Sequence, residues 1–315
     1  MLHTIGKNNV DRLSKAWFYC CESRNPFLQI FFVLLSSASI LCFLKFAMPH
    51  FPGPYLHWIH NAIIPIQIIW LYVSYYIVCT ANPGIITPKN IKAHLDYYKY
   101  DRLIYAPKDC STCKLQKPAR SKHCSMCKAC IGRLDHHCAW INGCVGENNQ
   151  RYFFIFLMTL VQFCAYGAYL CFQIYRGMII EWGLDKAYVY DPLTHLKTPY
   201  VLQHDRIIGA IGILAAVVSV VVFIFLAYQI YLAGRGITTN EAFKWEMIED
   251  AIDRGELFKI ENIQSSANGK NYTMHTSIQG VRTRERKIES LTEIDNIYDK
   301  GFMNNLYEVF FPPRF

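Results

Sequence analysis

Four long apolar runs stand out in the pattern of hydrophobic and polar positions along the chain. They cover residues 27–48, 58–79, 152–175 and 207–234. Each has the roughly 20 residues that a helix needs to cross a bilayer, and the last two contain no charged residue. Lys45, near the end of the first run, can extend its ammonium group to the membrane interface. The pattern predicts an all-α, polytopic membrane protein with four transmembrane helices.

The composition of the 315 residues supports this interpretation over a soluble one. Hydrophobic residues make up 52% of the chain and charged residues only 18%, which is typical of membrane proteins. The alternative is a soluble protein that buries all four runs as core helices. So short a chain would have difficulty covering them, and we expect an integral membrane protein.

Lysine and arginine in the loops predict the orientation of the chain. Residues 81–151 contain twelve of them, residues 49–57 none, and residues 176–206 four that are balanced by four acids. Because basic loops stay on the cytosolic side, we expect residues 81–151 and both termini in the cytosol. Most of the net charge of +8 then lies beside the membrane, where it suits anionic lipid headgroups better than nucleic acid. We therefore expect no nucleic-acid partner.

The apolar runs divide the chain into five parts. We predict a cytosolic N-terminus (1–26), a first helical pair (27–80), a cytosolic cysteine-rich domain (81–151), a second helical pair (152–234) and a cytosolic tail (235–315). Within the tail, residues 240–260 have apolar side chains at helical spacing, namely Phe243, Met247, Ile248, Ala251 and Ile252. We expect an amphipathic helix there, with Asn240 as its N-cap.

Cysteine and histidine are concentrated in the predicted cysteine-rich domain. Seven of the thirteen cysteines lie there: Cys110, Cys113, Cys124, Cys127, Cys130, Cys138 and Cys144. Disulfides are rare in the reducing cytosol, and C-x-x-C pairs with a nearby histidine are typical of zinc sites. Three histidines, His123, His136 and His137, raise the number of ligand-type side chains to ten. Two closed zinc sites use eight, which leaves one cysteine and one histidine over, unless a third metal or another pairing takes all ten.

The segment from Asp135 to Cys138, which reads DHHC, has the residue types of an activated thiol. A cysteine reacts as its thiolate, which a nearby histidine favours. An acid beside that histidine can orient it and stabilise its positive charge. We therefore take Cys138 as the nucleophile, His136 as its base and Asp135 as the residue that orients His136.

Residues 110–153 resemble the DHHC-type protein S-acyltransferases, or palmitoyltransferases. The family pattern C-x2-C-x9-HC-x2-C-x2-C-x4-DHHC-x5-C is matched at Cys110, Cys113, His123, Cys124, Cys127, Cys130, Asp135, His136, His137, Cys138 and Cys144. The supporting positions Lys117, Pro118, Arg120, Trp140, Gly146, Asn149 and Phe153 also fit. The family's TTxE motif is matched by Thr238, Thr239 and Glu241, and its C-terminal aromatic motif by the segment around Asn305.

The resemblance implies two structural zinc ions in interleaved sites. One is formed by Cys110, Cys113, His123 and Cys130, and the other by Cys124, Cys127, His137 and Cys144. Cys138 and His136 then remain free. The chain departs from the family pattern at Ala139, Gly143 and Asn82, where the family usually has proline, asparagine and aspartate. None of these departures removes a ligand or the nucleophile.

The resemblance also implies the reaction. Cys138 takes a long-chain acyl group from acyl-CoA, typically palmitoyl-CoA, and passes it to cysteine thiols of membrane-associated proteins. The CoA phosphates need cations, for which Lys117, Arg120 and Lys122 are the candidates, while Thr238, Thr239, Glu241 and Asn305 organise the site. The tail is similar to a fungal branch of the family that acts at the endoplasmic reticulum on cysteines beside membrane anchors, notably in SNARE-type proteins. The Golgi is the alternative location.

Two other functions compete with this interpretation. A catalytically inactive, membrane-anchored zinc-binding adaptor of the same fold would keep both zinc sites and need no reactive thiol. The presence of Asp135, His136 and Cys138 speaks against it. A RING-type ubiquitin ligase is the weaker alternative, because the order of cysteines and histidines in this chain does not fit that class.

Overall fold

A computed structural model describes residues 12, 14, 23–181, 188–190, 197–199, 205–262, 271–273 and 283–315. Four of its helices are long and apolar enough to cross a membrane: α2 (Phe27–Phe46), α3 (His60–Thr80), α5 (Gln150–Glu181) and α7 (Arg206–Gly234). They confirm the four predicted spans. The largest difference is at α5, which continues beyond the apolar run that ends at residue 175.

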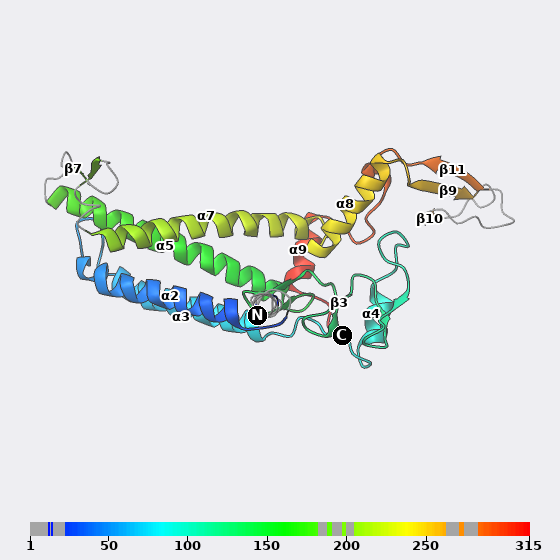
Figure 1. The fold of residues 1–315 in the computed structure, drawn as a ribbon, viewed down its shortest axis with the longest axis horizontal. Coiled ribbons are helices and arrows are strands. Elements are labelled where there is room, and N and C mark those ends of the chain that lie inside the picture. The colour runs from blue at the N-terminus through cyan, green and yellow to red at the C-terminus, as the bar shows by residue number, and fades with distance from the viewer. Residues whose placement is uncertain are drawn as a thin grey trace, which may run out of the picture.

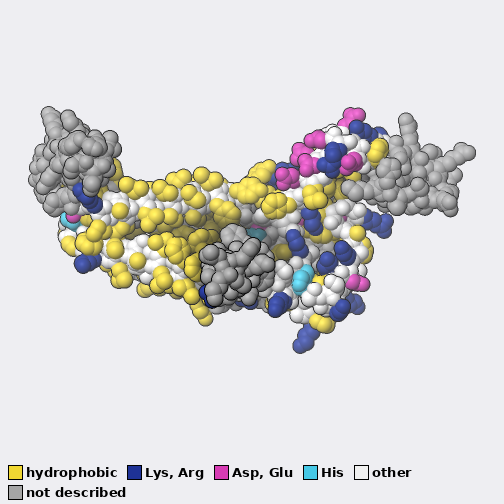
Figure 2. Space-filling view, in the orientation of Figure 1, with side chains coloured by type: hydrophobic (Ala, Val, Ile, Leu, Met, Phe, Trp, Pro, Cys, Tyr) yellow, Lys and Arg dark blue, Asp and Glu magenta, His cyan; other side chains and the backbone are white. Residues whose placement is uncertain are grey.

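The four helices lie side by side as an elongated bundle (Figure 1). The cysteine-rich segment and the tail lie at one end of the bundle, and the short strands β7 (Tyr188–Tyr190) and β8 (Lys197–Pro199) lie at the other. Large apolar side chains cover the outside of the bundle (Figure 2), among them Ile66 and Ile213, which are about two-thirds exposed. An outward apolar surface of this kind suits lipid rather than water.

Between α3 and α5 the chain forms one short helix and three small antiparallel hairpins. The helix is α4 (Ile91–Tyr97), and the strands pair as β1 (Lys108–Asp109) with β2 (Gln116–Lys117), β3 (Lys122–Cys124) with β4 (Ala129–Ile131), and β5 (His136–Cys138) with β6 (Gly143–Val145). Strands of two or three residues bury too little apolar surface to be stable alone. These hairpins therefore need other contacts to hold them in place.

After α7 the tail contains α8 (Thr239–Asp253), a sheet in the order β10 (Asn271–Thr273), β9 (Phe258–Asn262), β11 (Thr283–Lys287), and α9 (Phe302–Phe310). Two short 3₁₀ helices, η2 (Met48–His50) and η3 (Leu291–Glu293), complete the described elements.

The predicted amphipathic helix exists as α8, but two details of the prediction were wrong. Thr238, not Asn240, is the N-cap, and its side chain and that of Glu241 form a reciprocal capping box. The helix also ends at Asp253, because Gly255 adopts a left-handed conformation and the chain then enters β9.

Candidate active site and metal clusters

Two clusters of cysteine and histidine can each hold a metal ion. Within each cluster, one ligand atom per residue lies within 4.8 Å of all the others. The clusters are Cys110, Cys113, His123 and Cys130, and Cys124, Cys127, His137 and Cys144. These are the two sets that the resemblance implied, and neither contains Cys138 or His136.

The distances inside the clusters fit tetrahedral zinc. The Nδ1 atom of His123 lies 3.5, 3.3 and 3.8 Å from the sulfurs of Cys110, Cys113 and Cys130. The Nδ1 atom of His137 lies 3.4–3.6 Å from the sulfurs of its own three cysteines. Tetrahedral angles with ordinary zinc–sulfur and zinc–nitrogen bonds place such atoms about 3.6 Å apart. The donor set of three sulfurs and one nitrogen is also one that zinc favours.

The pairing of the hairpin strands explains why these residues meet. In the β3–β4 pair His123 is opposite Cys130, and in the β5–β6 pair His137 is opposite Cys144. Successive side chains of a strand point to opposite faces, so His123 and its neighbour Cys124 enter different clusters. In the same way, β5 directs His137 to a metal cluster and leaves the other face of the strand to His136 and Cys138.

The side chain of Asp135 is buried and pairs with that of His136, which is partly exposed. Nδ1 of His136 donates to Oδ2 of Asp135 at 2.7 Å, and Asp135 is 2% exposed. Because Nδ1 is occupied, Nε2 is the ring nitrogen that is left to exchange a proton with a thiol. The ring of Phe153 meets the His136 ring edge-on, at 5.3 Å between centroids, and so limits its rotation.

The charges of this pair favour a protonated histidine. Burial alone would lower the pKa of His136, but the Asp135 carboxylate and the sulfur of Cys138 outweigh burial and raise it to about 9. Burial alone would raise the pKa of Asp135, but its bonds to His136 and Thr239 hold it below the usual value. An imidazolium held beside a cysteine in this way is the arrangement that activates a thiol as a nucleophile.

The first turn of α8 holds the other side of the Asp135 carboxylate. The backbone N–H of Thr239 donates to Oδ1 at 2.7 Å, and its hydroxyl donates to Oδ2 at 2.8 Å. The N–H of Asn240 donates to the Asp135 carbonyl at 3.1 Å. The N-terminus of a helix favours negative charge, so α8 both fixes Asp135 and stabilises its ionised form.

A second buried network anchors that turn of α8. Glu241 binds the guanidinium group of Arg120, with Nε at 2.7 Å, and accepts from the hydroxyl of Tyr105 at 3.0 Å. Its carboxylate also accepts from the N–H of Thr238 at 2.9 Å. Arg120 donates in addition to the carbonyl of Gly236 at 2.9 Å. The TTxE residues are thus bonded to the cysteine-rich segment through two carboxylates, those of Asp135 and Glu241.

The position of Arg120 corrects its predicted role at the CoA phosphates. Its side chain is 1% exposed and is engaged by Glu241, so it cannot reach a bound nucleotide without breaking a buried ion pair. Lys122 is exposed and donates to Oδ1 of Asn240 at 2.8 Å, and Lys117 is half-buried. These two lysines remain predicted phosphate ligands.

Asn305, in α9, connects the tail to the end of α7. Its amide nitrogen donates to the carbonyl of Gly234 at 2.8 Å, and its amide oxygen accepts from the N–H of Lys300 at 2.9 Å. The ring of Phe302 packs so closely on Gly234 that a Cβ atom there would lie 2.2 Å from it. These bonds of Asn305 tie α9 to the end of α7.

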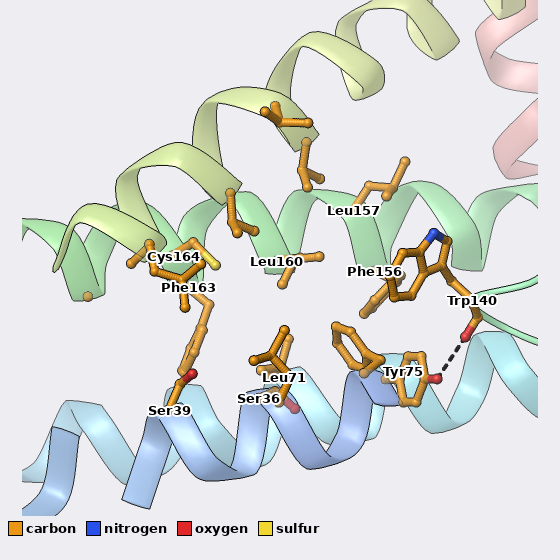
Figure 3. A pocket seen from close by; sticks show the side chains of 18 of the residues that line it. Ser36, Ser39, Leu71, Tyr75, Trp140, Phe156, Leu157, Leu160, Phe163 and Cys164 are labelled. Carbon is orange, nitrogen blue, oxygen red and sulfur yellow. Dashed lines mark hydrogen bonds between the residues drawn. The ribbon is translucent and has the colours of Figure 1, made fainter. Parts of the chain in front are cut away.

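A cavity of about 810 Å³ lies between the four long helices. Its wall is mainly apolar and includes Phe32, Leu35, Leu71, Tyr75, Phe156, Leu157, Leu160, Phe163, Val218 and Phe225. His136, Cys138 and Trp140 line it at the cysteine-rich end. Figure 3 shows Trp140 at one end of the cavity and Phe163 and Cys164 toward the other, with Ser39 opposite Phe163. The volume is in the range of ligand-binding cavities.

The contacts of two residues near this site, Tyr75 and Glu147, were not predicted from the sequence. The hydroxyl of Tyr75 donates to the carbonyl of Trp140 at 2.8 Å and so binds α3 to the turn that follows Cys138 (Figure 3). Glu147, fully buried, accepts from Tyr98 at 2.5 Å and pairs with His94 at 3.0 Å. The partners are far apart in sequence, and no motif marked them.

Comparison with known proteins agrees with these features. A family model described as DHHC palmitoyltransferase matches residues 104–246. The palmitoyltransferase swf1 of Schizosaccharomyces pombe is 30% identical over 77% of this chain and 64% of its own length. The palmitoyltransferase SWF1 of Neurospora crassa is 31% identical over 96% of this chain and 78% of its own length, and swf1 of Aspergillus fumigatus is 32% identical over 95% and 90%.

The matched region contains both metal clusters, the Asp135–Cys138 segment, two of the long helices and the start of α8. The relatives extend the similarity over most of the chain and are all named as palmitoyltransferases. On this similarity the chain belongs to the DHHC palmitoyltransferases, a family of acyltransferases.

Proposed function

We propose that this protein transfers a long-chain acyl group from acyl-CoA to cysteine thiols of membrane proteins, through an acyl-enzyme on Cys138. The observation that carries the proposal is the position of Cys138 and His136 in the wall of an apolar cavity between the membrane helices. A fatty acyl chain attached to Cys138 can lie in that cavity, where few water molecules can reach its thioester.

In the first step the Cys138 thiolate attacks the thioester carbonyl of acyl-CoA. The bond between the carbonyl carbon and the CoA sulfur breaks, and CoA leaves as a thiol after taking a proton. His136 accepts the proton of Cys138 and returns one to the leaving sulfur. Asp135 supports this exchange, because its bond to Nδ1 of His136 stabilises the imidazolium form.

In the second step the thiol of a substrate protein attacks the acylated Cys138. His136, again neutral, takes the proton of that thiol, and the Cys138 sulfur leaves as the acyl group moves. The reaction exchanges one thioester for another, so it needs no further energy source. The same histidine serves both half-reactions because Nδ1 stays bound to Asp135 throughout.

We further propose that the two cysteine–histidine clusters bind zinc as structural ions. A bound ion would fix the hairpins β3–β4 and β5–β6 relative to each other and so position Cys138 at the cavity. Neither Cys138 nor His136 belongs to a cluster, which leaves both free for acyl transfer. Lys117 and Lys122 are the proposed cations for the CoA phosphates.

The cellular setting is also part of the proposal. The excess of Lys and Arg in residues 81–151 favours a cytosolic active site and cytosolic termini. The relatives support a place in the fungal swf1 group, and we propose the endoplasmic reticulum as the membrane, with the Golgi as the alternative. The proposed substrates are transmembrane proteins with a cysteine beside the membrane, including SNARE-type proteins.

Incubation of the purified protein with labelled palmitoyl-CoA tests the mechanism. We expect a hydroxylamine-sensitive label on the wild-type chain and none on Cys138→Ala, with two zinc ions retained in that variant. Cys164→Ala, in a thiol that also lines the cavity, is the matched control and should take up label normally. A label that persists on Cys138→Ala refutes the nucleophile. A wild-type chain with two zinc ions and no label supports the inactive adaptor instead.

A further inference from the structure

The exposed side of α8 carries large apolar and acidic side chains together. Phe243, Glu246, Met247 and Asp250 recur at helical spacing and are all exposed, Phe243 by 64% and Met247 by 69%. We call these four residues the α8 outer face. Among the described residues, none forms an ion pair with Glu246 or Asp250, and the exposed acids Glu249 and Asp253 flank the face.

The outer face has no part in the packing of the helix. The opposite side of α8 supplies the contacts that hold it, because Ile248 and Ile252 pack with Leu257, Ile288 and Ile294. The apolar pattern predicted for residues 240–260 therefore divides into two sides. One side belongs to the core, and Phe243 and Met247 are left in solvent, one turn apart. Adjacent exposed apolar side chains of this size are typical of an interaction surface.

The helix that carries the outer face begins next to the reaction centre. Thr239, the first residue of α8, binds the carboxylate of Asp135. Glu246 and Asp250 follow it by seven and eleven residues, which is about 10 and 16 Å along a helix. Figure 1 shows α8 starting at the end of α7 and running away from the bundle. A peptide whose cysteine lies at Cys138 can therefore extend along this helix.

The charge of the outer face differs from that of its surroundings. The chain has a net charge of +8, and residues 81–151 alone contain twelve Lys and Arg. Figure 2 shows most of the acidic side chains of that end of the molecule gathered over α8, with a few basic ones among them. The CoA phosphates are repelled by an acidic surface, and a cationic peptide is attracted to it.

We propose that the α8 outer face binds the basic segment that flanks the acceptor cysteine of a transmembrane substrate. The proposal rests on the proposed function. It follows from charge complementarity, because the cytosolic flanks of membrane spans are rich in Lys and Arg. Glu246 and Asp250 pair with those cations, and Phe243 and Met247 contact their aliphatic stems. An extended chain rises about 3.3 Å per residue, so the cations recognised lie about three to five residues from the acceptor cysteine.

The test measures acyl transfer from preloaded enzyme to two peptides. Each is anchored by one membrane span and has one cysteine, and the five residues beyond it contain three Lys in one peptide and three Gln in the other. We expect the Lys peptide to react about tenfold faster at low salt, with the difference shrinking as salt rises. Asp250→Lys should reduce that ratio about threefold or more, and Asp250→Asn by less. Asp96→Lys, an equal charge change at an exposed position of α4, should leave it unchanged.

The result is expressed as the ratio of the Lys-peptide rate to the Gln-peptide rate, each per loaded enzyme, so partial misfolding of a variant does not affect it. Equal rates for the two peptides with the wild-type enzyme would overturn the inference, and so would an unchanged ratio in Asp250→Lys. A wild-type enzyme that does not load an acyl group at all is a different outcome, seen before any peptide is added. It would overturn the proposed function, and this inference with it.

Discussion

At the scale of single residues, the Asp135 carboxylate joins the two halves of the site. One oxygen accepts from His136 and from the hydroxyl of Thr239, and the other accepts from the backbone of Thr239. A carboxylate that is almost completely buried needs such donors, because the cost of removing it from water is otherwise large. The orientation of His136 therefore depends on a residue 104 positions away in the sequence.

Thr239→Val tests this dependence. The change removes the hydroxyl donor and keeps the backbone N–H, so Asp135 loses one of its three side-chain bonds. A hydrogen bond to a charged group contributes about 1.5–3 kcal/mol, and we expect the rate of Cys138 acylation to fall about tenfold or more. Thr239→Ser keeps the hydroxyl and should retain most of the rate. Equal rates for the two variants would show that the hydroxyl does not position His136.

The buried pair of Arg120 and Glu241 predicts a dependence of stability on pH. Burial alone would raise the pKa of Glu241, but the Arg120 guanidinium holds it below the usual 4.5. A lowered pKa contributes stability that is fully present above about pH 4.5 and is lost as pH falls through the folded-state value. We therefore expect the difference in unfolding temperature between wild type and Glu241→Gln to be largest near pH 6 and to shrink below pH 4.

Acid also releases metal from both the wild type and Glu241→Gln, so the informative quantity is the difference between their unfolding temperatures. Glu241→Gln leaves Arg120 buried without its counter-ion, which costs about 3–5 kcal/mol. Thermal unfolding in detergent at a series of pH values measures the gap. A gap that stays constant down to pH 3.5 would argue that Glu241 is not ionised in the folded protein.

At the scale of secondary-structure elements, the cysteine-rich segment consists mainly of three small hairpins, in place of the hydrophobic core that a soluble domain would have. Their strands contain two or three residues each, and buried cysteines provide part of the little apolar contact between them. Metal binding is the physical alternative to a hydrophobic core in segments of this size. The two clusters lie on opposite faces of β3, which contributes His123 to one and Cys124 to the other, while β5 contributes only His137. An ion in the second cluster would therefore also hold the strand that carries His136 and Cys138.

Cys124→Ala tests the assignment of the second cluster. We expect the zinc content to fall from two ions to about one per chain and the unfolding temperature to fall by about 5 °C or more. Metal analysis and thermal unfolding in detergent provide the two measurements. Cys42→Ala, a cysteine of α2 outside both clusters, should change neither value. Unaltered zinc content in Cys124→Ala would contradict the ligand set.

At the scale of the whole molecule, the cavity depends on all four long helices together. Its wall contains side chains from α2, α3, α5 and α7, and its end near the hairpins contains Cys138. Tyr75 and Asn305 fix the cysteine-rich end of this arrangement, the first by its bond to Trp140 and the second by its bond to Gly234. The space available to an acyl chain is thus a property of the assembled bundle.

Leu160→Trp tests whether the cavity holds the acyl chain. Leu160 points into the cavity from α5 (Figure 3), so the larger ring should shorten the usable space. We expect loading with a 16-carbon acyl-CoA to fall about tenfold more than loading with a 12-carbon one. Ile213→Trp, on the lipid-facing side of α7 and 67% exposed, is the matched control. An equal loss for both chain lengths would indicate that the chain lies elsewhere.

Much of the fold and of the candidate site is determined by features that are local in the sequence. The four spans follow from uninterrupted apolar runs, since the cost of burying backbone polar groups in lipid leaves few structures other than helices. The two ligand sets follow from C-x-x-C spacing and the family pattern, and the alternation along β5 separates His137 from His136 and Cys138. The apolar runs and the C-x-x-C pairs need only a few neighbouring residues, whereas the division of the ligands between two sites was implied by the family resemblance.

The burial and the long-range contacts of individual side chains are determined only by the tertiary structure. Arg120 was predicted to bind the CoA phosphates, but it is buried in an ion pair with Glu241, 121 positions away. Phe243 and Met247 belong to the apolar pattern of the predicted amphipathic helix, but the positions of the partners of α8 leave them exposed. The bond of Thr239 to Asp135 and the shape of the cavity also depend on the tertiary structure. Each depends on which distant segments meet, and no local pattern contains that information, because the same side chain can be buried, paired or exposed according to its neighbours in space.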